Sequence, residues 1–162
     1  MITRPKWQPK RGLASDEIPA DAITADLRTS NNALSFWQCG EATDSEILTA
    51  VLAIAAGRDR LQKLDIVWIP RDELVKSGHQ MRATRGRTPV RTLVKRHVDV
   101  CHLDYVRLGQ IGDQVAGAIK RDRFRRFPQR AIRGLLIEAV QDGSVSEEDL
   151  AETLRTEIRA AL

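Results

Sequence analysis

Cysteine and long apolar runs are both scarce in this sequence, and each scarcity argues against a class of protein. The two cysteines, Cys39 and Cys101, have no CxxC neighbour, so we expect reduced, buried thiols rather than a disulfide framework. The longest apolar run, residues 47–56, is interrupted by Thr49 and falls well short of the roughly 20 residues needed to cross a bilayer. We therefore expect no membrane partner. The first residues carry positive charge without a following apolar segment, which argues against a secretory signal and predicts a cytoplasmic protein.

The short motifs that mark common enzyme classes are absent as well. The sequence contains no P-loop, GxSxG, HExxH or Rossmann glycine pattern, each of which would indicate a specific chemistry. Potential metal ligands do cluster, at His97, Asp99, Cys101, His102 and Asp104. In a strand the first three would face one side and the last two the other, so we predict no metal site and no cofactor.

Length and composition favour one folded domain. The chain has 162 residues, of which 42% are apolar and 30% charged, as is ordinary for a compact globular domain. Residues 1–22 hold Pro5, Pro9 and Pro19, with Trp7 as their one aromatic residue, and we expect a poorly ordered amino-terminal arm. Residues 23–162 are predicted to form a single α/β domain, with a mixed α+β fold as the alternative.

The first half of this domain predicts a small β-β-α-β sheet core. Residues 23–28 alternate in hydropathy, a Ser-Asn-Asn turn follows, and residues 33–39 contain large apolar side chains, so a hairpin is predicted. Residues 43–46 have the S/T-x-x-E form of a capping box, and we expect a helix from there to a left-handed Gly57. The β-branched run at 64–69 predicts a buried strand. A right-handed crossover would place this strand parallel to one strand of the hairpin.

The segment that follows has weaker local signals. A short helix is expected at residues 71–76 and an exposed basic loop at 80–89. Apolar residues within 90–108 fit neither a helical nor a strand period throughout, and we expect a helix that changes into a strand near His97.

The carboxyl-terminal part is predicted to be mainly helical. Helices are expected at residues 111–121 and 128–141, the second because a proline in the first helical turn loses no hydrogen bond. A turn at 142–144 and apolar residues at four-residue steps then predict a C-terminal helical hairpin over residues 128–162.

Basic residues are concentrated in the middle of the sequence. Residues 82–133 carry 14 basic and 4 acidic side chains, whereas residues 134–162 carry 2 basic and 7 acidic ones. Such asymmetry indicates either an anionic partner for the middle segment or docking of the acidic tail against it. Arginine is much commoner than lysine here, and its planar guanidinium both binds phosphate through two hydrogen bonds and stacks on bases.

The residues predicted to bind nucleic acid all belong to this basic segment. In Arg123-Phe-Arg-Arg-Phe two phenylalanines are interleaved with arginines, a pattern compatible with stacking of unpaired bases. The alternative is that both rings belong to the core and that the arginines pair with tail carboxylates such as Glu147 and Glu152. The predicted contact residues are Arg82, Arg85, Arg87, Arg91, Lys95, Arg96, Lys120, Arg121, Arg123, Phe124, Arg125, Arg126, Phe127 and Arg130.

Three functional hypotheses follow from these observations. The first is a non-enzymatic binding subunit that uses an arginine-rich surface to contact nucleic acid or an acidic protein surface, most specifically nucleic acid. The second is a protein-protein interaction role, as a neutralising or assembly subunit, with anchors such as Trp7 and Trp37. The third is a metal-dependent nuclease or other hydrolase, for which Asp65, His97 and Asp99 are the residues to test.

Overall fold

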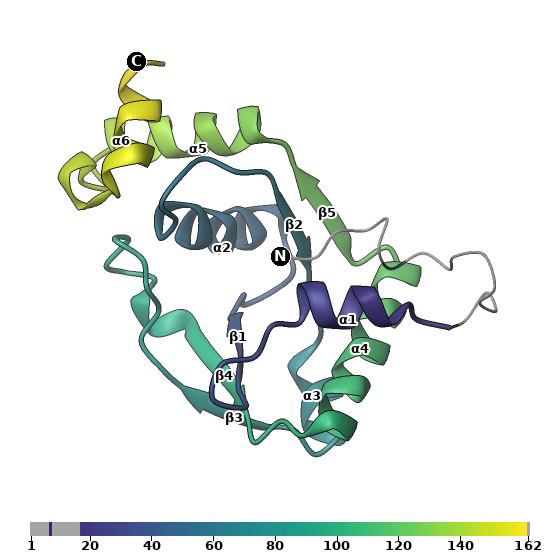
Figure 1. Cartoon of the computed structure of the whole chain (residues 1–162). Helices are drawn as coiled ribbons and strands as arrows, with labels where there is room; N and C mark the ends of the chain where they lie inside the picture. Colours follow the sequence, from purple (N-terminus) through teal and green to yellow (C-terminus); the bar gives the residue numbers. More distant parts are fainter. Residues whose placement is uncertain (1–6, 8–16, 162) are drawn as a thin grey trace. The chain divides into compact units, whose positions relative to one another are not determined.

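The chain alternates between two structural units in the computed structural model, which describes residue 7 and residues 17–161 (Figure 1). Unit 1 comprises residues up to 36, 65–82 and 99–125, and unit 2 comprises residues 37–64, 83–98 and 126–162. At each of the five places where the chain passes from one unit to the other, it does so inside a β-strand. Neither unit is therefore a continuous stretch of sequence.

Helices and antiparallel strands are mixed along the chain, which confirms the predicted α/β or α+β class. The helices are α1 (Ala20–Asp26), α2 (Asp44–Ala56), α3 (Arg71–Lys76), α4 (Tyr105–Lys120), α5 (Gln129–Gln141) and α6 (Glu152–Arg159), with 3-10 turns η2 (Val94–Arg96) and η3 (Glu147–Asp149). The strands are β1 (Leu34–Trp37), β2 (Leu64–Val67), β3 (Gln80–Ala83), β4 (His97–Cys101) and β5 (Phe124–Phe127). They form a sheet of order β1-β4-β3 and a second sheet of β2 and β5. In the described part of the chain, no helix has the length and apolarity that spanning a membrane requires.

Unit 1 has a core between α1, α4 and the strand residues next to them. Helix α1 packs on α4, where a Cβ at Gly112 would lie 3.1 Å from Cδ1 of Ile23. Trp7 is buried in this core, and its indole N–H donates to the buried Asp26 carboxylate at 3.0 Å. Residues 20–22, at the end of the expected amino-terminal arm, begin α1. Residues 1–6 and 8–16 of that arm lie outside the described residues.

The predicted β-β-α-β core is wrong in its first element and in its strand pairing. Residues 23–28, predicted as a strand, mostly belong to helix α1. The predicted turn is present, and Asn31 in it has a left-handed backbone, with φ 52°. Strand β2 pairs with β5 and not with β1, and the sheets are antiparallel rather than joined by a parallel crossover. The predicted loop at 80–89 begins with strand β3, because residues 80–83 pair with β4.

Unit 2 is built on packed helices. Helix α2 begins at the capping box as predicted, and the Thr43 hydroxyl accepts from the backbone N–H of Glu46 at 3.4 Å. Helix α5 packs against both α2 and α6 (Figure 1). Leu136 of α5 and Leu154 of α6 are fully buried. Gly57 follows α2, but with φ −81° it is not left-handed, so that prediction is wrong.

Candidate nucleic-acid interface

Five basic residues and no acidic one lie between β3 and β4, in a segment that we call the basic loop (residues 84–96). The base of the loop continues the pairing of its two strands. The N–H of Thr84 donates to the carbonyl of His97 at 3.1 Å, and the N–H of Gly86 donates to the carbonyl of Val94 at 2.9 Å. These bonds hold the two ends of the loop together.

Buried apolar contacts hold the rest of the basic loop in place. Val90 is 3% exposed and Leu93 is 7% exposed, so both side chains point into the core of unit 2. Gly86 lies so close to the Trp37 indole that any Cβ at this position would collide with the ring. A second close contact joins Gly57 to Arg87, because a Cβ at Gly57 would collide with the Arg87 carbonyl oxygen. These contacts hold the basic loop against other parts of unit 2.

Four basic side chains of this loop point into solvent. Arg85, Arg87, Arg91 and Lys95 are all exposed. Within the described residues, none of the four takes part in a hydrogen bond or ion pair. A cation that is not held in an ion pair remains available to an external anion, so the loop presents four such charges.

The fifth basic residue of the loop, Arg96, is engaged inside unit 2. Its Nη1 donates to the Glu46 carboxylate at 2.6 Å, and the N–H of Gly40 donates to the same carboxylate oxygen at 3.0 Å. The hydrogen bond from Gly40 and the charge of Arg96 together lower the pKa of Glu46. Arg96 thus helps to fix the start of α2. Because its guanidinium is already paired with Glu46, it is less available to an external anion than the four exposed cations of the loop.

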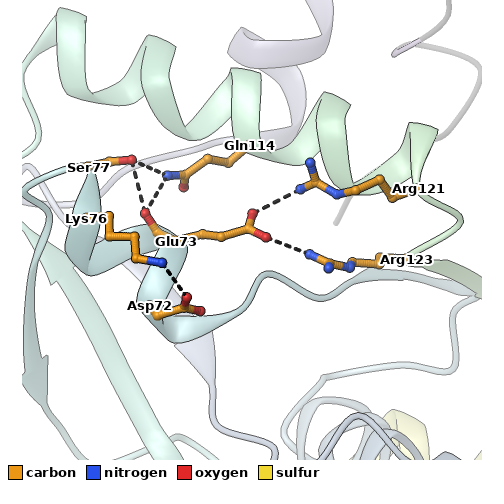
Figure 2. Close-up of polar contacts among 7 residues, drawn as sticks. All are labelled: Asp72, Glu73, Lys76, Ser77, Gln114, Arg121 and Arg123. Atoms are coloured by element: carbon orange, nitrogen blue, oxygen red, sulfur yellow. Dashed lines mark hydrogen bonds and ion pairs between the residues drawn. The ribbon is translucent and has the colours of Figure 1, made fainter.

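Two further predicted contact residues are engaged in unit 1 by one acidic residue of α3 (Figure 2). Arg121 donates to one carboxylate oxygen of Glu73 at 2.9 Å, and Arg123 donates to the other at 2.8 Å. Gln114 of α4 donates to the Glu73 carbonyl at 3.2 Å and to the Ser77 hydroxyl at 2.8 Å. Glu73 therefore joins α3 to α4 and to the residues before β5.

The Arg-Phe-Arg-Arg-Phe motif forms strand β5 and the residue before it. Phe127 is 7% exposed and belongs to the core of unit 2, and Phe124 is half-buried in unit 1. Arg125 and Arg126 both take part in interactions within the protein. Stacking of bases on these two rings stays a prediction, and in this structure the Phe127 ring has almost no surface to offer a base.

The other predicted contact residues are exposed and lie apart in the sequence. They are Arg82 of β3, Lys120 at the end of α4, and Arg130 in the first turn of α5.

Two carboxylates of the acidic tail serve local contacts. Glu147 pairs with Arg159 of α6, and Glu157 accepts the backbone N–H of Leu61 at 2.7 Å. These two carboxylates therefore do not pair with the arginines of the basic segment.

Arg58 and Arg60 were missed by reasoning from sequence, because they lie outside the basic segment. They line a pocket together with Arg87 of the basic loop, and all three residues belong to unit 2. Folding therefore brings two cations from the end of α2 to the basic loop. A charge count along the sequence carries no signal for this.

The candidate metal-binding and catalytic residues do not form a common site among the described residues. Thr84 Oγ1 lies 2.7 Å from Nδ1 of His97, and the Ser35 hydroxyl donates to Asp99 at 3.0 Å, so each group has its own partner. Asp65 is buried, at 5% exposure. Over residue 7 and residues 17–161, no three His, Cys, Asp or Glu side chains are arranged to hold a metal ion.

The chain has no match among protein-family models, curated proteins or solved structures. Its function is therefore inferred from its own contacts and charges. The basic loop, with four exposed cationic side chains, is the strongest candidate site among the described residues.

Proposed function

We propose that this protein is a non-enzymatic binding subunit whose basic loop contacts the phosphate backbone of nucleic acid in the cytoplasm. The proposal is carried by one observation: Arg85, Arg87, Arg91 and Lys95 are exposed, and within the described residues they have no partner. Phosphate oxygens are strong acceptors for guanidinium groups, which can donate two parallel hydrogen bonds to them. Both cysteines are free thiols in the structure, which fits a reducing compartment.

The rigidity of the loop supports binding as well. Backbone hydrogen bonds and the buried Val90 and Leu93 already fix the loop before any ligand arrives. Less conformational freedom is then lost on association, so more of the electrostatic attraction appears as affinity. Because the four exposed side chains are cations and the loop has no aromatic residue of its own, we expect contacts to phosphates and little sequence preference.

The salt dependence of binding tests this proposal. Four neutralised phosphates predict a slope of log affinity against log salt of about −2.8 for a single strand, or an affinity loss of about 50-fold between 50 and 200 mM salt. Fluorescence anisotropy of a labelled oligonucleotide, titrated with the full chain at several salt concentrations, measures the slope. A flat response would refute the proposal.

Charge-matched variants test whether the basic loop is responsible. The double variant Arg85→Gln/Arg91→Gln should lower the magnitude of the slope by about 1.4 and weaken binding to all sequences alike. The matched control, Arg28→Gln/Arg71→Gln, removes two exposed charges from unit 1 and should leave the slope unchanged. Equal losses in both variants would mean that net charge, and not the loop, determines binding.

An acidic protein surface is the alternative partner for the same loop. If the chain binds no oligonucleotide at low salt but forms a stoichiometric complex with an acidic protein, and Arg85→Gln/Arg91→Gln disrupts that complex, the protein partner is the correct one.

A further inference from the structure

A pocket of about 470 Å³ lies in unit 2 next to the carboxyl end of α2. The residues that line it are Gly57, Arg58, Asp59, Arg60, Gln62 and Arg87. Three of them are cations and one is an anion, so the lining carries a net charge of +2. Such a pocket attracts an anion small enough to enter it.

The backbone around the pocket is tightly packed. Gly57 leaves no space for a side chain, because any Cβ there would collide with the Arg87 carbonyl oxygen. This contact brings the basic loop against the end of α2. As a result, Arg87 is held in the same lining as Arg58 and Arg60, which come from a different part of the chain.

Arg58 has a hydrogen-bonding group that the fold does not satisfy. Its Nη1 donates to Gln62 Oε1 at 3.2 Å, but its buried Nε has no acceptor within the described part of the chain. Burial lowers the pKa of the Arg58 guanidinium, which nevertheless stays charged at neutral pH because arginine titrates far above that range. This Nε has no exposed surface, so Arg58 contributes to the pocket through its positive charge rather than through this donor.

We propose that this pocket binds a phosphate monoester group. A monoester carries a charge of nearly −2 at neutral pH and three acceptor oxygens, which matches the charge of the lining and its three guanidinium groups. A phosphodiester within a strand carries only −1 and is continued by the strand on both sides. The ligand is therefore either the terminal phosphate of a nucleic-acid strand or a small phosphorylated molecule. This goes beyond the proposed function, with which it shares only Arg87.

Isothermal titration calorimetry of the full chain with inorganic phosphate, at constant ionic strength, tests the pocket. Saturable binding to one site is expected. Arg60→Gln should weaken it roughly tenfold to a hundredfold, because a charge-assisted hydrogen bond is lost. Lys63→Gln, which removes an exposed charge nearby but outside the lining, should leave the affinity within about twofold.

Asp59→Asn provides a variant whose expected effect cannot arise from misfolding. It removes the one negative charge of the lining and should therefore strengthen phosphate binding several-fold. Absence of saturable binding to the unmodified chain would overturn the proposal, as would affinities that are the same in Arg60→Gln, Asp59→Asn and the unmodified chain.

Oligonucleotides of one sequence with a 5′-phosphate or a 5′-hydroxyl distinguish the two sources of the ligand. A preference of tenfold or more for the phosphorylated end, lost in Arg60→Gln, would identify the end of a strand. Phosphate binding without that preference would identify a small molecule. The 5′-hydroxyl oligonucleotide also separates this proposal from the proposed function. If this oligonucleotide fails to bind while phosphate binds, the proposed function fails and the pocket proposal stands. If the oligonucleotide binds while phosphate does not, the pocket proposal fails and the proposed function stands.

Discussion

Replacing Gly57 by alanine distinguishes two reasons for a glycine at the end of α2. Its backbone has φ −81° and ψ 4°, which alanine adopts freely, so chain entropy alone would make the variant more stable by about 0.4–1 kcal/mol. The new Cβ, however, would collide with the Arg87 carbonyl oxygen and lie 3.1 Å from the carbonyl carbon. A backbone group cannot rotate away as a flexible side chain can, and overpacking of this kind costs about 1–3 kcal/mol. We therefore expect a net loss of about 1–2 kcal/mol.

Denaturant unfolding of the full chain measures this loss. The matched control is Gly134→Ala in α5, where a new Cβ has no described atom within 4 Å. That variant should gain about 0.5–1 kcal/mol, because alanine favours the helix interior over glycine. A Gly57→Ala protein as stable as the unmodified chain would refute the close approach of the basic loop to α2.

Three further predictions test other contacts. His79 is buried, neither ring nitrogen has a partner among the described residues, and burial lowers its pKa. The unfolded chain then binds the proton more readily, so the unfolding free energy should fall as pH drops below about 6.5, by at most about 1.4 kcal/mol per pH unit, and less so in His79→Leu. Glu73→Gln weakens two half-exposed ion pairs and should cost about 0.5–1.5 kcal/mol in thermal or chemical unfolding. Thr43→Ala removes the cap of α2 and should cost about 1 kcal/mol, whereas Ser146→Ala, at a position without a side-chain cap, should change stability by less than about 0.5 kcal/mol.

Elements with strong local signals were predicted correctly. The capping box at Thr43 begins α2, and the β-branched run after Lys63 forms β2. Helix α1 was predicted as a strand because Ile23, Ala25 and Leu27 alternate with polar residues, and a segment of seven residues is too short for the helical period to dominate. The Asp26 carboxylate of this helix accepts a hydrogen bond from the Trp7 indole, which is 19 residues away in the sequence. The local hydropathy pattern does not reveal such a contact.

Strand pairing was beyond local reasoning. Strand β3, with the sequence Gln-Met-Arg-Ala, has no β-branched residue and lies at the edge of its sheet, so its pairing with β4 is the main evidence of a strand. In β5 the two phenylalanines are three residues apart, which does not match the two-residue period of a strand.

Only the amino-acid composition of the candidate site could be predicted from the sequence. The excess of arginine in residues 82–133 is visible in the sequence, but which of those cations are already paired is not. That division depends on Glu73 and Glu46, which are distant in sequence from the arginines they contact. That residues 23–162 form a single domain stays a prediction.

The alternation of the chain between its two units has a consequence for the protein while it is still being synthesised. Helix α2 packs on α5, yet α5 begins about 85 residues after α2 does. At a translation rate of about 5–20 residues per second, the apolar side of α2 on a nascent chain waits roughly 4–17 seconds for its cover. Neither unit can be completed from its first segment, so the apolar side of α2 stays uncovered until α5 has been synthesised.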